Sequence, residues 1–456
     1  MTAPTPVATP AFELAPDFSG QIVRRDSPEY EQARRVHNGL IDKHPAVIAR
    51  CRTAADVGAT VRSARRQGLE IAVRGGRHNV AGRATLDDGV VIDLSLMRDV
   101  HVDPAARTAR AQGGATWAEF NTATQAHGLA ATGGIISSTG VAGLTLGGGL
   151  GWLLGRQGLS IDHLLSAEII TADGQTVNAS ADENADLFWA IRGAGANFGV
   201  ATTLEFRLHP VGPIITGGLI AYPLDQARDV LRFYRDVTAD CPDDMTVYVG
   251  LVPAPDGSGV KLAGVLVCHC GDLRAGEEAV RPLKEFGRPA MDVVGPMPYT
   301  ALNSMLDAGY PAGALNYWKA TFIDTLTDDV IDGMIDAFAR CPSPMGQIVI
   351  EHMHGAATRV DPGAAAFAHR GEGYSLLVLS QWMQPGDTDR CIQWARESYA
   401  ALAPHGAESS YVNYLGHDEG ETRVAAAYGS NYARLRELKA KYDPDNVFHL
   451  NQNIRP

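Results

Sequence analysis

Apolar and polar residues follow two different periods along this chain, and the period changes from segment to segment. Short apolar or alternating runs predict strands, whereas apolar residues that recur every three to four positions predict helices. In the first 212 residues these patterns predict strands at 46–51, 71–74, 90–94, 108–112 and 200–208, and helices at 30–35, 54–67 and 117–127. Both kinds of element therefore share this half of the chain.

The pattern changes after residue 212. From 213 to about 405 longer helices, such as 224–239 and 328–340, alternate with apolar strands such as 245–251 and 347–350. The last segment, 410–456, returns to short loops and one charged helix at 424–442. We therefore expect three consecutive parts, preceded by a loose leader at about residues 1–20.

Glycine is concentrated in one stretch, with ten glycines between residues 131 and 160. Because glycine loses the most backbone entropy on folding, such density needs a reason, either crowded turns or a ligand that lies on the main chain. The spacings Gly149-x-Gly151-x-x-x-Gly155 and Gly193-x-Gly195-x-x-x-Gly199 are each one residue longer than the dinucleotide fingerprint. No clear strand with a suitably spaced acidic residue accompanies them, so a Rossmann fold is not favoured.

Composition narrows the function classes. The 456 residues are 45% hydrophobic and 20% charged, as in an ordinary globular protein, and the net charge of -13 argues against nucleic-acid binding. Six cysteines are too few for a disulfide framework, and Cys268 and Cys270 lie in an apolar run that indicates buried side chains. Residues 1–18 carry no secretion signal, and no apolar stretch reaches membrane-spanning length, which predicts a cytoplasmic protein without a membrane partner.

Four motifs together resemble a known family. They are residues 73–82 (VRGGRHNVAG), 93–97 (DLSLM), 186–193 (DLFWAIRG) and 442–453, which begins YDPDNVF and ends NQN. In this order they are similar to the berberine-bridge-enzyme-like oxidases, which are vanillyl-alcohol-oxidase-type flavoproteins with a PCMH-type FAD-binding domain. The resemblance covers residues 30 to 454.

The resemblance implies a two-domain α+β fold of the vanillyl-alcohol-oxidase type. Residues 1–212, together with the returning C-terminal segment 411–456, are expected to form the FAD-binding domain. Residues 213–410 are expected to form the substrate domain, an antiparallel sheet with helices over one face. The flavin ring would lie between the two domains.

The resemblance also implies a covalent bond between His78 and the 8α carbon of FAD. A neutral imidazole is a competent nucleophile near pH 7, and the preceding glycines let main-chain N–H groups approach the diphosphate. Arg77 departs from the glycine or small residue of many relatives and puts a cation near the diphosphate. Many relatives have a second, cysteine tether at the position of Ile136, so a single tether is expected.

Further cofactor contacts follow from the same resemblance. Thr139 matches a position near flavin N5, where a small hydroxyl influences oxygen reactivity, and the main chain of Val200 matches a position at the adenine. The other expected contacts are Arg74, Gly75, Gly76, Arg77, Asn79, Gly82, Ser137, Ser138, Gly140, Gly143, Leu144, Thr145, Gly148, Gly149, Asn413 and Asn451.

The substrate-side candidates lie mostly in the middle of the chain. Glu351 follows the strand 347–350 and matches an acidic position that faces the flavin, which makes it the candidate base; a surface carboxylate is the alternative. Lys319 matches another substrate-facing position, and Tyr248 is a further candidate for the same cavity.

The C-terminal tetrad from Tyr411 to Tyr414 is interpreted as a strand that lines flavin and substrate. Alternation then puts Tyr411 and Asn413 on one face and Tyr414 on the other. Asn413 is expected to contact flavin or substrate and Tyr414 to contact substrate, while one of the two tyrosines could instead be a core residue.

A metal site is not expected. His352 and His354 stand two residues apart in a strand, on the face opposite Glu351 and Met353, whereas the His-Glu-x-x-His motif needs two histidines one helical turn apart.

Together these features predict an FAD-dependent oxidase. A small organic substrate (an alcohol, amine, sugar or specialised metabolite) would give hydride to covalently bound flavin, and dioxygen would reoxidise it. Two alternatives remain within flavin chemistry: an oxygenase of polyketide-type metabolism, and a dehydrogenase with another electron acceptor. A non-catalytic binding protein is the third. The sequence does not indicate an oligomeric state.

Overall fold

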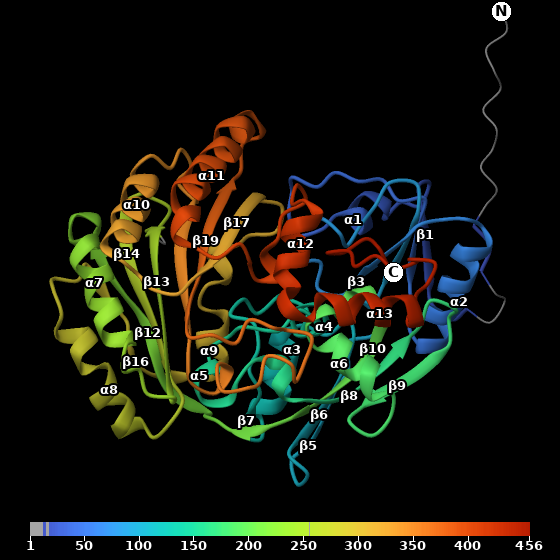
Figure 1. The fold of residues 1–456 in the computed structure, drawn as a ribbon, viewed down its shortest axis with the longest axis horizontal. Coiled ribbons are helices and arrows are strands. Elements are labelled where there is room, and N and C mark those ends of the chain that lie inside the picture. Colours follow the sequence, from blue (N-terminus) through green and yellow to red (C-terminus); the bar gives the residue numbers. More distant parts are fainter. Residues whose placement is uncertain (1–11, 15–17, 255) are drawn as a thin grey trace, which may run out of the picture.

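The structure is a computed structural model that describes residues 12–14, 18–254 and 256–456. Two sheet-containing halves lie side by side, and the chain passes from one half to the other and back again (Figure 1). Residues 1–11 and 15–17 of the expected leader lie outside the described residues. Phe12, from the same leader, is buried in a core of the first half.

The first half consists of β1 (Gln21–Arg24), α1 (Tyr30–Arg34), β2 (Val47–Arg50), α2 (Ala54–Arg66), β3 (Ile71–Arg74), β4 (Val90–Asp93), β5 (Val100–Asp103), β6 (Thr108–Gln112), α3 (Trp117–Gln125), β7 (Leu129–Ala130), α4 (Val141–Leu146), α5 (Leu154–Gln157), β8 (Leu164–Ile170), β9 (Thr176–Ser180), α6 (Ala185–Ala194), β10 (Val200–Arg207) and β11 (His209–Pro210). One sheet has the order β1–β2–β4–β3, with β2, β4 and β3 parallel. A second sheet is antiparallel, in the order β5–β6–β10–β8–β9, and β7 and β11 form a two-stranded antiparallel sheet. Each helix and strand predicted here is confirmed with ends that differ by at most two residues. The strands β1, β5, β7, β8, β9 and β11 and the helices α4 to α6 were not predicted.

Crowding explains only part of the glycine-rich segment. A Cβ added to Gly149 would lie 2.1 Å from the Ser160 Oγ, and the φ of +89° at Gly149 is itself left-handed. A Cβ at Gly151 would lie 1.8 Å from the Gly133 carbonyl oxygen. Gly143, in contrast, has open space within 4 Å of that position, and it lines a cavity. Both reasons for the glycines therefore apply, at different positions.

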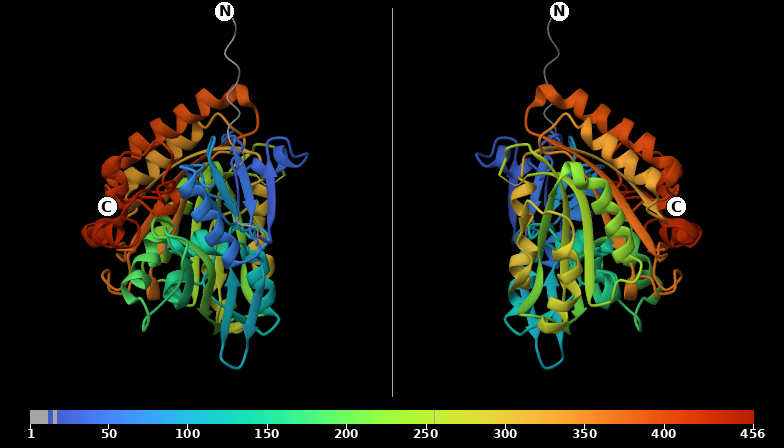
Figure 2. Two further views of the ribbon diagram at one scale, coloured as in Figure 1. Left: turned by 90° about the vertical axis from the view of Figure 1, so that its right-hand side faces the viewer. Right: turned by 90° about the vertical axis from the view of Figure 1, so that its left-hand side faces the viewer.

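The second half is one large sheet with helices on one face. Its elements are β12 (Ile214–Pro223), α7 (Ala227–Thr238), β13 (Met245–Pro253), β14 (Lys261–His269), α8 (Leu273–Glu285), β15 (Met291–Asp292), β16 (Gly295–Pro298), α9 (Tyr299–Ser304), β17 (Leu315–Ile323), α10 (Asp328–Ala339), β18 (Gln347–Met353), β19 (Gly373–Trp382) and α11 (Thr388–Leu402). The strand order is β15–β12–β14–β13–β18–β19–β17, with β16 paired to β12, and every pair is antiparallel. The helices α7, α8, α10 and α11 share one hydrophobic core with this sheet; Figure 2 shows the orange helix α11 along the outer side. The expected α+β fold, with an antiparallel sheet covered on one face, is confirmed.

The C-terminal segment returns to the first half. Its helices are α12 (Glu421–Tyr428) and α13 (Tyr432–Tyr442), and α13 packs against α6 (Figure 1). The prediction of one helix at 424–442 is wrong, because a 3-10 turn with Gly429 at φ +56° separates the two helices. Lys439 anchors the segment: its buried Nζ donates to Asp443 Oδ2 (2.6 Å) and to the carbonyl oxygens of Asn197 and Phe448.

Two negative observations complete the fold. Within the described part of the chain, none of the helices combines the length and apolar composition that a membrane crossing requires. All six cysteines are free, and Cys268 and Cys270 are buried, as the apolar run predicts.

Candidate active site

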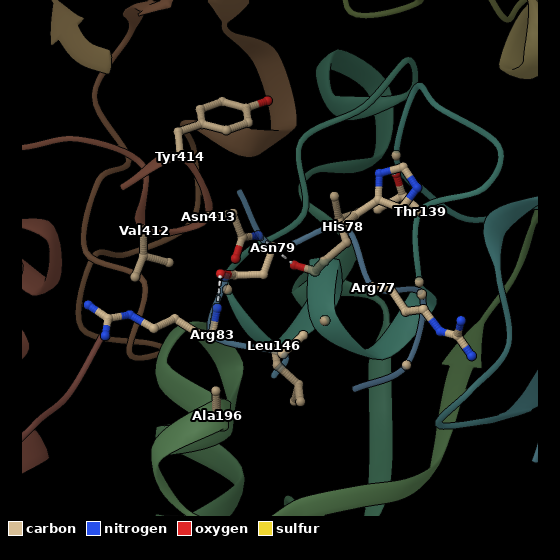
Figure 3. Close-up of a pocket in the computed structure, with 18 of the residues that line it drawn as sticks. Arg77, His78, Asn79, Arg83, Thr139, Leu146, Ala196, Val412, Asn413 and Tyr414 are labelled. Carbon is tan, nitrogen blue, oxygen red and sulfur yellow. Dashed lines mark hydrogen bonds between the residues drawn. The ribbon is translucent and has the colours of Figure 1, made fainter. Parts of the chain in front are cut away.

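A cavity of about 310 Å³ lies where the two halves meet. The loop after β3, the glycine-rich segment, the wall formed by β17, β18 and β19, and the C-terminal segment all contribute to its lining. A smaller cavity of about 120 Å³ adjoins it and shares Gly143 and Asn451 with it. Figure 3 shows His78 and Tyr414 on opposite sides of the larger cavity.

His78 is held by neighbours on three sides. Its Nε2 lies 2.9 Å from the Ser138 Oγ, and its Nδ1 lies 3.5 Å from the Thr139 Oγ1. The ring stacks on His37, with centroids 3.9 Å apart and planes inclined by 22°. Burial lowers the pKa of His78 to about 3, so the imidazole is neutral at physiological pH and keeps a lone pair free for nucleophilic attack.

The main chain passes unusually close to itself beside His78. A Cβ at Gly76 would lie 2.2 Å from the Gly140 nitrogen, and a Cβ at Gly140 would lie 2.5 Å from the Gly76 nitrogen. Arg77, which lies between Gly76 and His78 in the sequence, has a φ of 66°, in the left-handed region that favours glycine. The departure from glycine at this position therefore keeps the backbone conformation of glycine but adds a side chain, whose guanidinium lies 3.3 Å from Asp93.

Two arginines that line the cavity have buried nitrogen atoms without a hydrogen-bond partner among the described residues. Arg74 and Asp93 form a fully buried ion pair of 2.7 Å, yet the Arg74 Nε and Nη1 have no partner among the described residues, and neither does the Arg83 Nε. Both arginines line the cavity. Leaving buried donors unpaired is costly. An anionic group such as the diphosphate of FAD would satisfy them, so the residues present fit this cofactor.

Most of the expected cofactor residues come together here. The residues that line the larger cavity are Arg74, Gly75, Gly76, Arg77, His78, Asn79, Thr139, Gly140, Gly143, Leu144, Asn413 and Asn451, and Val200 lines the smaller one. Six expected residues line neither cavity: Gly82, Ser137, Ser138, Thr145, Gly148 and Gly149. Of these, Ser138 contacts His78, Ser137 bonds to Asp307, and the Gly149 N–H donates to the Tyr411 hydroxyl.

The opposite wall carries the candidate base. Glu351, on β18, is 5% exposed and lines the cavity. The Tyr414 hydroxyl donates to Glu351 Oε1 (3.0 Å), whereas Oε2 has no partner among the described residues. Burial raises the pKa of Glu351 to about 7, although Tyr414 and Ser375 lower it in part. A carboxyl group with that pKa can accept a proton near neutral pH.

Two substrate-side candidates lie outside the cavity lining. Lys319 points to the other face of β17, where its Nζ donates to Asp418 Oδ1 (3.0 Å) and Glu419 Oε1 (2.8 Å). Tyr248 is buried between the halves, stacked on Trp152, and its hydroxyl donates to the Gly151 carbonyl oxygen. Neither side chain lines the cavity, although Tyr248 is the cross-strand neighbour of Glu351, so a substrate contact of either residue stays a prediction.

The tetrad 411–414 does not form the expected strand. Residues Val412–Tyr414 form a 3-10 turn, so Asn413 and Tyr414 both line the cavity (Figure 3). Tyr411 is the core residue: it is 1% exposed, and its hydroxyl accepts hydrogen bonds from the Gly149 N–H and the Asn413 Nδ2. The hydrogen bond between Gly149 and Tyr411, which are 262 residues apart, therefore helps to fix the backbone conformation of this turn.

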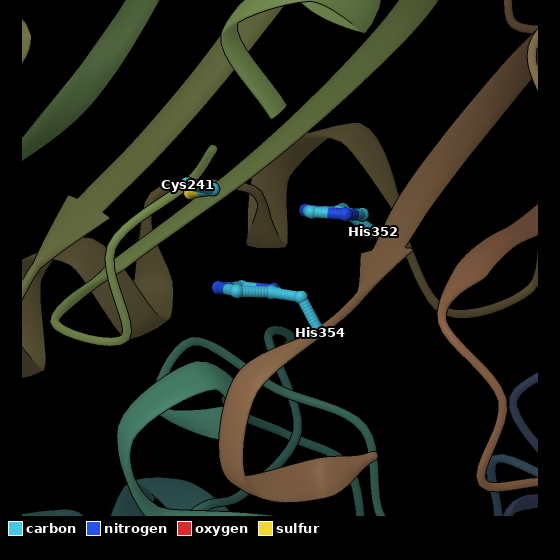
Figure 4. A group of neighbouring side chains, drawn as sticks. All are labelled: Cys241, His352 and His354. Carbon is cyan, nitrogen blue, oxygen red and sulfur yellow. The ribbon is translucent and has the colours of Figure 1, made fainter. Parts of the chain in front are cut away.

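The two histidines after Glu351 gain a neighbour that the sequence did not indicate. Among the described residues, Cys241, His352 and His354 are the one group of three whose ligand atoms lie within 4.8 Å of one another (Figure 4). The two rings are stacked, with planes inclined by 3°, so a cation on the in-plane lone pair of one ring would lie outside the plane of the other. His354 Nε2 also donates to the Met245 carbonyl oxygen. This arrangement resembles a packed core more than a tetrahedral metal site.

Several lining residues were not predicted. They include His37, Arg83, Leu146, Ala196, Tyr310, Trp318, Val349, Leu377, Leu379, Val412 and Gln452. Strand alternation could have identified four of them, once the side of each strand that faces the cavity is known: Trp318, Val349, Leu377 and Leu379.

Comparisons with known proteins agree with this geometry. A family model described as an FAD binding domain matches residues 45–180, and one described as berberine and berberine like matches residues 410–455. The chain is 32% identical to (R)-6-hydroxynicotine oxidase of Paenarthrobacter nicotinovorans over 454 residues, with 96% of this chain and 97% of that protein covered. It is 27% identical to a xylooligosaccharide oxidase of Thermothelomyces thermophilus, with 95% and 92% covered. The crystal structure of 6-hydroxy-D-nicotine oxidase from Arthrobacter nicotinovorans superposes with a TM-score of 0.88 at 30% identity, covering 99% of this chain and all of that one.

Proposed function

The chain belongs to the berberine-bridge-enzyme-like FAD-linked oxidoreductases, and from this premise we propose that it is an oxidase of a small organic substrate with dioxygen as the acceptor. One observation carries the proposal most directly. The Glu351–Tyr414 pair stands across the cavity from His78, so a proton acceptor and the expected cofactor loop enclose one space. A substrate in that space would give its proton to Glu351 and its hydride to a flavin held by the loop.

The cofactor chemistry sets what the residues have to do. Bound FAD supplies a two-electron acceptor that takes hydride from the substrate and returns the electrons to dioxygen as hydrogen peroxide. The protein has to hold this group, exclude water from it and accept the substrate proton. Arg74 and Arg83 would hold the diphosphate through the donors that are unpaired, and Asn413 is positioned between the glycine-rich segment and the wall, with its Nδ2 donating to the Leu144 carbonyl oxygen.

The tether is part of the proposal. His78 would bond to the 8α carbon of the flavin, as a neutral imidazole whose ring is already oriented by Ser138 and His37. A second tether requires a thiol, and Ile136 supplies none where it lines the cavity. Residues 1–212 and 411–456 would form the FAD-binding domain and residues 213–410 the substrate domain.

Glu351 would act as the general base and Tyr414 as the group that orients it. The carboxylate must be ionised to accept a proton, and a pKa near 7 makes both of its forms accessible at neutral pH. The Tyr414 hydroxyl fixes Oε1, which leaves Oε2 for the substrate. The pKa of Tyr414 is raised well above 10 by burial and by the nearby carboxylate, so its phenol stays protonated and donates.

Stopped-flow spectroscopy of the purified holoenzyme tests this function. Under anaerobic conditions a panel of alcohols, amines, sugars and aromatic polyketides should bleach the flavin with at least one member, and air should restore the oxidised spectrum with release of hydrogen peroxide. Slow reoxidation in air would identify a dehydrogenase, and incorporation of labelled oxygen into product would identify an oxygenase. A flavin that no member of the panel bleaches would favour a binding protein.

A further inference from the structure

The wall opposite the cofactor loop consists of paired rows of residues on β17, β18 and β19. In the strand register, Trp318 on β17 pairs with Leu379 on β19, and Leu379 pairs with Gln347 on β18. One step along the sheet, Leu377 pairs with Val349. Because side chains alternate along a strand, these rows share the face that lines the cavity. Four large side chains of that face that line the cavity are apolar: Trp318, Val349, Leu377 and Leu379.

The polar residues of the same strands point away or are already bonded. Lys319 is engaged with Asp418 and Glu419, and His352 packs against Tyr374 on the helix-covered side. On the cavity side, the Tyr310 hydroxyl donates to Gln347 Oε1 (3.0 Å). Glu351 is therefore the one ionisable carboxyl that β17, β18 and β19 present to the cavity within the described chain.

One oxygen atom of the Glu351 carboxyl group accepts no hydrogen bond among the described residues. Glu351 Oε1 receives the Tyr414 hydroxyl, while Oε2 is buried and has no hydrogen-bond partner among the described residues. No basic side chain forms an ion pair with it in this part of the molecule, since its described polar neighbours are hydroxyl groups. A buried, unpaired carboxylate oxygen is costly, and a ligand that brings a donor removes that cost.

We propose that the substrate is a flat apolar ring compound with one O–H or N–H donor beside the carbon that is oxidised. Its ring would lie against Trp318, Leu377 and Leu379, and its donor would bond to Glu351 Oε2. This inference rests on the proposed oxidase function and names the substrate class of the same site. The wall disfavours an oligosaccharide, because its many hydroxyls would lose their hydration against these apolar side chains.

The size of the site agrees with a small ligand. The cavity of about 310 Å³ is at the lower end of ligand pockets, which range from about 300 to 1,000 Å³, and part of it has to receive the flavin. A ligand of one or two rings with a single polar end therefore fits this volume better than a chain of sugar units does. Alcohol and amine substrates share this chemistry, and the experiment separates them.

Equilibrium titration of the oxidised holoenzyme tests the inference, with flavin absorbance as the readout of binding. The probes are phenol and aniline (a ring with an O–H or N–H donor), anisole (the same ring without a donor) and cellobiose. Phenol or aniline should bind at least about tenfold more tightly than anisole, because one hydrogen bond to a charged group contributes about 1.5–3 kcal/mol. Whichever of the two binds more tightly identifies the donor, and cellobiose should bind more weakly than either.

A pair of matched variants locates the effect. Leu377→Asn keeps the side-chain size but makes the wall polar, and it should weaken binding of the preferred aromatic probe about tenfold or more. The same change at Leu273, which is 40% exposed on α8, should leave the affinity unchanged. Tighter binding of cellobiose than of the aromatic probes, equal affinities for phenol, aniline and anisole, or unchanged affinity in Leu377→Asn would each overturn the inference.

These outcomes remain separate from those of the oxidase proposal. If the aromatic probes bind as expected but no alcohol or amine bleaches the flavin, the wall chemistry stands and the oxidase fails. If sugars bleach the flavin and dioxygen restores it, the oxidase stands and the substrate class is wrong.

Discussion

The hydroxyl of Tyr414 lies 3.0 Å from the Oε1 of Glu351, although 63 residues separate them in sequence. Glu351 belongs to the large sheet, and Tyr414 belongs to the turn from which the C-terminal segment returns to the first half. The hydrogen bond therefore joins the two parts of the chain at the cavity. The orientation of the candidate base depends on how firmly the C-terminal segment is held.

Lys319 ties the start of this segment to β17 through Asp418 and Glu419, and its loss should be costly. Removing its charge would leave Asp418 and Glu419, which are 26% and 11% exposed, without that partner. We expect Lys319→Met to lower the free energy of unfolding by about 1–3 kcal/mol, measured by urea denaturation. Lys284→Met is the control: its pair with Asp292 is a more exposed one, with Lys284 37% exposed, and its loss should cost under about 1 kcal/mol. Equal losses in the two variants would contradict this role.

The tether prediction concerns His78. Wild-type protein precipitated with acid should stay yellow, whereas His78→Ala should release all of its flavin into the supernatant, because the nucleophile is gone. His101→Ala, on the exposed side of β5, is the matched control and should keep the colour in the pellet. Free FAD recovered from the wild type would exclude the covalent bond.

The number of tethers is a separate prediction. Because Ile136 occupies the position of the second attachment, peptide mapping should find flavin on a single peptide, the one that contains His78. Mass spectrometry of the digest is the measurement. A flavin-modified cysteine would show that the loop 134–140 is aligned wrongly with its relatives.

The stack of His37 on His78 predicts a graded effect on attachment. The backbone N–H of His37 donates to the Arg77 carbonyl oxygen (3.1 Å) and so fixes His37, whose ring covers one face of His78. His37→Ala should lower the covalently bound fraction of flavin, and His37→Phe, which restores an aromatic ring, should recover most of it. The covalent fraction is read from the absorbance of the acid pellet relative to the total. Equal fractions in wild type and His37→Ala would show that the stack has no part in attachment.

The local parts of the site could be predicted from the sequence, whereas the parts that depend on distant contacts could not. The loop around His78 is one continuous motif, so its glycines and its histidine identify it directly. The sequence does not decide whether Trp318 or Lys319 faces the cavity, because adjacent residues of a strand face opposite sides. The pairing of β17 with β19 places Trp318 on the cavity side. The residue pattern at 411–414 predicts a strand, whereas the observed turn depends on a hydrogen bond between Tyr411 and Gly149, far away in the sequence.

The last prediction concerns the base itself. Glu351→Gln keeps the size of the side chain but removes the ionisable carboxylate, and loss of a general base typically slows a reaction by about 10²–10⁴-fold. The decrease should appear in the rate of anaerobic flavin reduction, while reoxidation by dioxygen changes little because it does not use the substrate proton. In the wild type the reduction rate should rise with pH through about 7, as Glu351 loses its proton, and this rise should vanish in the variant.

Tyr414→Phe separates the two members of the pair. The Tyr414 hydroxyl lowers the pKa of Glu351 by donating to its ionised form, so its removal should raise that pKa and move the midpoint of the pH profile to higher pH. At pH values well above that midpoint, the variant should approach the wild-type rate. If Glu351→Gln instead reduces flavin normally and Tyr414→Phe does not at any pH, Tyr414 is the base. If neither change affects flavin reduction, the proton leaves the substrate by another route, and this wall serves only for binding.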